Sequence, residues 1–103
     1  MHTELYIDSS TVVVTTGKIF VDTSRRSVLL LITPPSNGNK DTLIIKKITN
    51  DNNSISLFCN GCKIDDNDII IFGLSPNIDR RIGTSHYIEL QSNGPNWKII
   101  REF

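Results

Sequence analysis

Residues 87–100 read Tyr87-Ile88-Glu89-Leu90-Gln91-Ser92-Asn93-Gly94-Pro95-Asn96-Trp97-Lys98-Ile99-Ile100, and this stretch decides the fold class. Apolar and polar residues alternate before the turn, which predicts a strand with one buried face and one wet face. Asn93 and Gly94 can supply the two positive-φ positions of a type I′ or related turn, and Pro95 cannot donate to a strand ladder. The stretch therefore predicts a β-hairpin.

Trp97 is the only tryptophan and follows the turn on an apolar strand. We expect its ring to close the end of the core, with the indole N–H donating to a turn carbonyl. The alternative is a sugar-stacking platform. Asn93, Gly94 and Trp97 are thus the expected structural residues of the hairpin.

The rest of the chain also reads as short strands separated by turn residues. Alanine is absent and β-branched residues are abundant, which disfavours helix and favours strand. The predicted strands are Thr3–Ile7, Thr11–Thr15, Lys18–Val21, Val28–Thr33, Thr42–Ile48, Ser54–Cys59, Asp68–Phe72, His86–Gln91 and Asn96–Arg101. Short strands at near-regular spacing predict one all-β domain over residues 1–103, a small β-sandwich or jelly-roll-like barrel.

Two of these strands, Val28–Ile32 and Ile69–Phe72, are apolar throughout. Such strands are typically covered on both faces, whereas a single small sandwich covers only inner faces. The second layer can come from a neighbouring subunit or from the loop Gly73–Ser85. The positions expected inside are Val13, Ile19, Leu29, Leu31, Ile45, Leu57, Ile70, Ile88, Leu90, Trp97 and Ile99.

Charge and hydropathy argue against two classes of partner. Lys plus Arg is 11 and Asp plus Glu is 11, and a net charge of zero argues against non-specific binding to nucleic acid. The longest apolar run, Val28–Ile32, is too short to cross a bilayer. Met1–Glu4 lacks the features of a secretory signal. We expect a soluble protein made in a cytosol, without membrane insertion.

Cys59-Asn60-Gly61-Cys62 is a C-x-x-C motif. A thioredoxin-like site needs a helix N-terminus and a structural zinc site needs four ligands, and the sequence indicates neither. Asn60-Gly61 is a two-residue hairpin signal, which predicts two reduced, half-buried thiols beside a turn. The alternative is a structural disulfide, because the Cα separation across such a turn permits one, although the Cβ direction is not ideal. Asp65-Asp66-Asn67-Asp68 lacks the glycine and distant glutamate of an EF-hand and is expected to be a solvated acidic turn. No metal or cofactor is expected.

Two arginine pairs, Arg25-Arg26 and Arg80-Arg81, fall in predicted loops. They can bind an anionic glycan through bidentate hydrogen bonds, or they only keep the surface soluble. The two histidines show no surrounding triad, and Glu89 with Asp65 offers only a weak pair of carboxylates. No catalytic residue is assigned, and we expect a protein that is not an enzyme.

The hairpin resembles the end of a recurrent domain in phage tail fibres and in surface or fibre proteins of large DNA viruses and their satellite viruses. In that family an apolar-x-Leu strand runs into Ser-(Asp/Asn)-Gly-x-(Asn/Asp)-Trp and then an apolar strand. The residues that match in order are Leu90, Ser92, Asn93, Gly94, Asn96, Trp97, Ile99 and Ile100.

Less specific likeness continues upstream, over most of the chain. Asp66 stands where the family usually has the glycine of Ile-Asp-Gly, so the chain departs from the pattern at that turn. The upstream stretches that look similar are Val21-Asp22-Thr23, Ile32-Thr33-Pro34-Pro35, Leu43–Ile48, Asn53–Leu57 and Ile64-Asp65-Asp66.

The resemblance implies a homotrimeric all-β head or connector on a virion appendage, made in the host cytoplasm and displayed on the virion surface. The domain can belong to a longer fibre chain. Its expected partners are further copies of itself and a host-surface glycan or receptor, and the family offers no catalytic residues to carry over.

Two other functions stay open. A glycan-binding, lectin-like domain acting as a monomer or dimer would show a shallow exposed aromatic site with polar partners. A hydrolase fragment of a tailspike would show a cleft with paired carboxylates. An assembly module would instead show a large apolar contact patch.

Overall fold

The computed structural model describes residues 3–13, 17–35, 41–73 and 86–103, and these residues form strands and no helix. The nine predicted strands are confirmed, and their ends within the described residues differ by no more than two residues; the predicted end of Thr11–Thr15 lies outside the described residues. The strands are β1 (Thr3–Ile7), β2 (Thr11–Val13), β3 (Gly17–Val21), β4 (Val28–Ile32), β5 (Thr42–Lys47), β6 (Ile55–Cys59), β7 (Ile69–Phe72), β8 (Tyr87–Asn93) and β9 (Asn96–Glu102).

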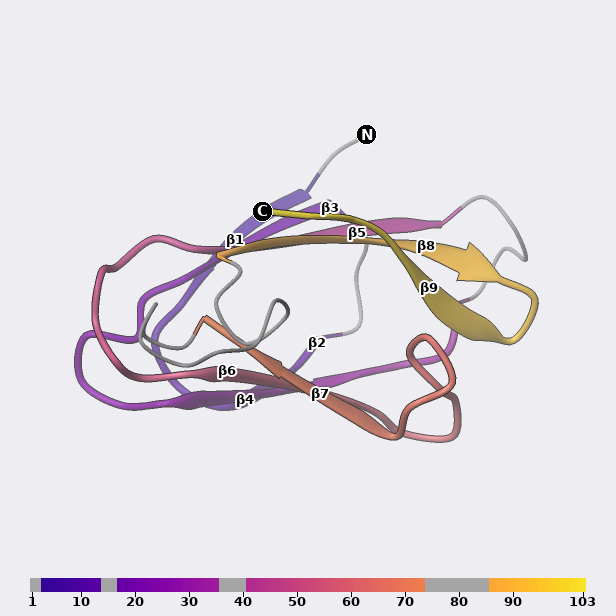
Figure 1. Cartoon of the computed structure of the whole chain (residues 1–103), viewed down its shortest axis with the longest axis horizontal. Coiled ribbons are helices and arrows are strands. Elements are labelled where there is room, and N and C mark those ends of the chain that lie inside the picture. Colours follow the sequence, from indigo (N-terminus) through magenta and orange to yellow (C-terminus); the bar gives the residue numbers. More distant parts are fainter. Residues whose placement is uncertain (1–2, 14–16, 36–40, 74–85) are drawn as a thin grey trace.

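The strands form two mixed sheets that pack face to face (Figure 1). The five-stranded sheet has the order β1-β3-β5-β8-β9, and the four-stranded sheet has the order β2-β4-β6-β7. From β1 to β6 the chain changes sheet at every step, and each strand pairs in parallel with the strand two before it. The first six strands therefore wind as a flattened coil. A jelly roll pairs its strands antiparallel, so this coil departs from that expectation.

Three antiparallel pairs complete the sheets: β5 with β8, β6 with β7, and β8 with β9. In the predicted hairpin, Asn93 lies opposite Asn96. Gly94 has a φ of 64°, whereas Asn93 does not have a positive φ and Pro95 is restricted to negative φ. The prediction of two positive-φ residues at Asn93-Gly94 is therefore wrong. Glycine alone occupies the first central position, as in a type II′ turn.

The core lies between the two sheets and consists of alternate residues along the strands. On β4 the buried residues are Val28, Leu30 and Ile32, so the prediction that Leu29 and Leu31 lie inside is wrong. A run of five apolar residues has no polar position to indicate which face is buried. Ile99 is partly buried against the core, and the side chain of Val13 falls outside the described part. The other expected residues are buried: Ile19, Ile45, Leu57, Ile70, Ile88, Leu90 and Trp97.

Trp97 packs as predicted. It is 4% exposed, and its indole Nε1 donates to the carbonyl of Thr33, just after β4, at 2.9 Å. Its own backbone N–H donates to Lys63, and its carbonyl accepts from Asp65. Trp97 thus connects β9 to the segment after β4 and to the connection between β6 and β7, and its buried ring has no open face on which a sugar could stack.

Candidate functional site

Only one of the two predicted arginine pairs lies among the described residues. Arg25 and Arg26 are exposed in the connection from β3 to β4, and Arg80-Arg81 lies outside the described residues. Hydrogen bonds from Ser24 lower the pKa of Asp22, and the charge of Arg25 adds to this effect. A site for an anionic glycan formed by both pairs therefore stays a prediction.

Cys59 and Cys62 are joined by a disulfide, with their Cα atoms 5.2 Å apart. Both residues are buried, and Gly61 between them has a φ of 91°. The prediction of two reduced, half-buried thiols is therefore wrong, because the turn directs both sulfur atoms into the core. Asn60-Gly61 also fails to join two adjacent strands, since β7 begins only at Ile69. We assign the disulfide a structural role.

The acidic run is a solvated turn, as predicted. Ile64 and Asn67 pair with each other, and Asp65 and Asp66 between them are exposed, with φ values of 52° and 69°. Over the described ranges, no group of three or more His, Cys, Asp or Glu side chains could hold a metal ion.

The contacts of Glu89 and Asp65 are with other residues and not with each other. Glu89 accepts the hydroxyl of Tyr87 at 3.1 Å and lies 3.9 Å from the guanidinium of Arg101. The backbone N–H of Asp65 donates to Trp97. These contacts are those of surface residues on a strand and on a turn.

The strongest candidate for a contact surface is the outer side of the four-stranded sheet. We define the outer apolar face as Leu29 and Leu31 on β4, Phe58 on β6, and Ile69 and Ile71 on β7. The register places Leu31 beside Phe58 and Phe58 beside Ile69, which gives a continuous row across three strands. Leu29, Ile69 and Ile71 are 38%, 46% and 46% exposed.

No charge interrupts the outer apolar face. The residue between Leu29 and Ile71 in the register is Ser56. The strands of the five-stranded sheet, by contrast, expose Lys18 and Lys46. Contiguous exposed apolar patches mark interaction sites, and the cores of protein interfaces are depleted in charge. The face therefore suits contact with another protein surface.

The sequence indicated this surface through its two apolar runs, because it predicted a second layer over β4 and β7. In the structure Leu29, Ile69 and Ile71 are exposed, so the described residues place no covering layer over them. The alternative covering by Gly73–Ser85 falls on residues 74–85, outside the described part.

A buried lysine, Lys47 at the end of β5, holds the nearby loops together. It is 3% exposed, and its Nζ donates to the carbonyls of Asp51 at 2.7 Å, of Asn53 at 2.8 Å, and of Gly73. The Asp51 carboxylate lies 3.2 Å away. An ammonium group has three donors, and all of them have acceptors here. The Lys47 amine therefore has a structural role, because its hydrogen bonds hold these loops to the end of β5.

The same network keeps Asp51 ionised. Burial raises the pKa of its carboxyl, but hydrogen bonds from Thr49, Thr23 and Lys47 outweigh burial and lower the pKa to about 2. The hydroxyl of Thr23 donates to Asp51 at 2.8 Å. Sequence reasoning missed these residues. The available signal was Lys47 itself, a charged residue at an inward position of an alternating strand.

Comparison of the chain with protein-family models, with curated proteins and with solved structures gives no match. The described part of the chain has no helix that is long and apolar enough to cross a membrane. Its two-sheet geometry and its surfaces are therefore the basis for inferring what it does.

Proposed function

We propose that this chain is a non-enzymatic assembly and attachment module that associates with copies of itself through the outer apolar face. The observation that supports this proposal is the uncharged row formed by Leu31, Phe58 and Ile69. Burying apolar surface contributes about 25 cal/mol per Å² removed from water. The net charge of zero opposes association only weakly.

The resemblance of the C-terminal hairpin to viral fibre domains makes a homotrimer the expected assembly. It also makes a fibre or capsid-surface appendage of a virion the expected location. In a trimer of this kind the outer apolar faces meet around the axis. The outer side of the five-stranded sheet then points away from the axis, where it can contact a host-surface molecule.

The test is the mass of the protein in solution, measured by size-exclusion chromatography with light scattering. The parent protein is expected at three times the 11.6 kDa of one chain. Ile69→Lys combined with Ile71→Lys should yield monomers. These side chains are about half exposed on β7, so the lysines can extend into water without disturbing the core.

Ile100→Lys is the matched control, because Ile100 is 37% exposed but lies on β9 of the other sheet. It should leave the trimer intact. A parent protein that is monomeric at micromolar concentration would overturn the proposal. If the β7 double variant is folded by circular dichroism and remains a trimer, the outer apolar face is not the contact surface of the trimer.

A further inference from the structure

Two stretches of the chain share the pattern aliphatic-aromatic-aliphatic-Asp: Leu5-Tyr6-Ile7-Asp8 and Ile19-Phe20-Val21-Asp22. They end β1 and β3, which pair in parallel with Tyr6 beside Phe20. Parallel pairing in this register places each strand residue of one stretch beside the residue at the same position of the other stretch. The two rings therefore stack, with centroids 4.9 Å apart and planes inclined by 20°.

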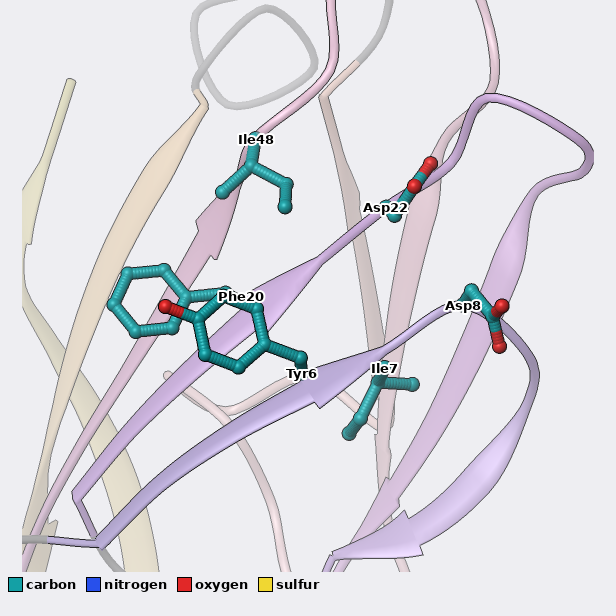
Figure 2. Close-up of a pocket in the computed structure, with 6 residues that line it drawn as sticks. All are labelled: Tyr6, Ile7, Asp8, Phe20, Asp22 and Ile48. Carbon is teal, nitrogen blue, oxygen red and sulfur yellow. The ribbon is translucent and has the colours of Figure 1, made fainter.

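A shallow hollow of about 250 Å³ lies where β1, β3 and β5 end (Figure 2). These strands are parallel neighbours, so their carboxyl ends meet at one edge of the sheet. Figure 2 shows the two rings on one side of the hollow and the two carboxylates on the other. Tyr6 is 72% exposed. The lining residues are Tyr6, Ile7, Asp8, Phe20, Asp22 and Ile48.

Charges in and around the hollow restrict what it can bind. Asp22 accepts the backbone N–H of Ser24 at 2.8 Å, and the hydrogen bonds with Ser24 lower its pKa, so it is ionised at neutral pH. Asp8 is a second, exposed carboxylate, and no lining residue is cationic. An anionic ligand would therefore be repelled.

Positive charges flank the hollow and offset part of the charge of its two carboxylates. Arg25 is close enough to Asp22 to act on its carboxyl, in addition to the larger effect of Ser24. Lys46 is exposed and lies beside Phe20 in the register. The arrangement favours a neutral ligand with one apolar face and several hydroxyl donors.

We propose that this hollow binds a neutral sugar, with one pyranose ring stacked on Tyr6 and its hydroxyls donating to Asp8 and Asp22. The C–H face of a pyranose is apolar and weakly positive, which suits the negative face of an aromatic ring. Ionised carboxylates only accept hydrogen bonds, which suits hydroxyl donors. Phe20 supports the tyrosine ring, and the small volume suits one sugar residue of a larger glycan.

This inference rests on the attachment role proposed above and names the ligand that the protein would attach to. Sugar binding does not require the trimer, because all six lining residues come from one chain. Its expected affinity for a single sugar is in the millimolar range. Display in several copies would raise the apparent affinity for a surface that carries many glycans.

The experiment is an NMR titration of the isotope-labelled protein with the methyl glycosides of glucose, galactose, mannose, N-acetylglucosamine and N-acetylgalactosamine. N-acetylneuraminic acid and choline serve as anionic and cationic comparison ligands. At least one neutral sugar should shift the signals of residues 6–8, 20–22 and 48. Tyr6→Ala should weaken its binding at least about tenfold, and Tyr6→Phe should retain most of it.

Phe103→Ala is the matched control. Phe103 is 75% exposed and contacts Tyr87 on the same sheet at 5.3 Å between ring centroids, but it does not line the hollow. It should bind sugar like the parent. The proposal is overturned if no neutral sugar binds below about 50 mM, if choline or N-acetylneuraminic acid binds more tightly, or if Tyr6→Ala leaves binding unchanged. Light scattering on the same samples keeps the two proposals separate, since a monomer that binds sugar contradicts only the trimer.

Discussion

Trp97 connects segments that are far apart in the sequence, because its indole reaches Thr33 and its backbone pairs with Lys63 and Asp65. We predict that Trp97→Ala lowers the free energy of unfolding by about 3–5 kcal/mol, since it leaves a cavity and a carbonyl without its donor. That is a large part of the roughly 5–15 kcal/mol typical of a small domain. Trp97→Phe keeps a ring in place and should cost about half as much.

Urea unfolding followed by circular dichroism measures the free energy of unfolding of the parent and of both variants. The light-scattering mass of each variant shows whether loss of the core also releases monomers. An alanine variant as stable as the parent would show that the buried ring contributes little to the core.

The contacts of Asp51 predict a dependence of stability on pH. Folding lowers the pKa of this carboxyl from 3.8 to about 2, so it adds stability above pH 4 that is lost as the pH falls toward 2. We predict that the parent loses about 1–2 kcal/mol more than Asp51→Asn over this interval. Urea unfolding at pH 7, 4 and 2.5 provides the comparison. Equal losses in the two proteins would mean that the network with Lys47 and Thr23 does not stabilise the charge.

At the scale of elements, the turn between Ile64 and Asn67 holds two aspartates in the left-handed region. That conformation costs most residues about 1–2 kcal/mol, although aspartate tolerates it better than most. Glycine adopts it freely but loses more chain entropy on folding, by about 0.4–1 kcal/mol. We therefore predict that Asp66→Gly stabilises the protein by about 0.5–1 kcal/mol.

Thermal unfolding of Asp66→Gly beside Asp68→Gly separates this effect from the loss of a surface charge. Asp68 pairs with Lys63 on the surface and does not have a positive φ. Only the change at position 66 should raise the melting temperature. A lower melting temperature for Asp66→Gly would show that the aspartate side chain stabilises the turn.

The strands differ in how far their own residues indicate the buried face. β6 and β8 alternate in sequence, and the predicted faces are the buried ones. β4 is apolar at all five positions, and the prediction chose the wrong face. The side-chain period of two is readable only where polar residues occupy the other face.

At the scale of the whole molecule, the two sheets present outer sides of different chemistry. The outer apolar face lies on the four-stranded sheet, and the hollow lies on the five-stranded sheet packed against it. Assembly through one side thus leaves the other accessible. Effects of substitutions at the two sites on stability should add, because distant sites with no shared partners are usually independent.

The coil formed by the first six strands explains how the hollow arises. After each strand in the four-stranded sheet, the chain comes back to the five-stranded sheet and runs parallel to the strand that it formed there before. In this way β3 pairs with β1, and β5 pairs with β3. Three strand ends therefore meet at one edge, and the repeated aromatic and acidic residues meet with them. A hairpin would instead have placed the two stretches in opposite directions.

The sequence by itself determined the nine strands and the buried position of Trp97. These depend on local properties: β propensity, turn residues and alternation along one strand. Only the tertiary structure decided which strands pair, the parallel register of Tyr6 with Phe20, the disulfide between Cys59 and Cys62, and the buried face of β4. These depend on contacts between distant residues, and the pattern of one strand carries no information about its partner in another turn of the coil.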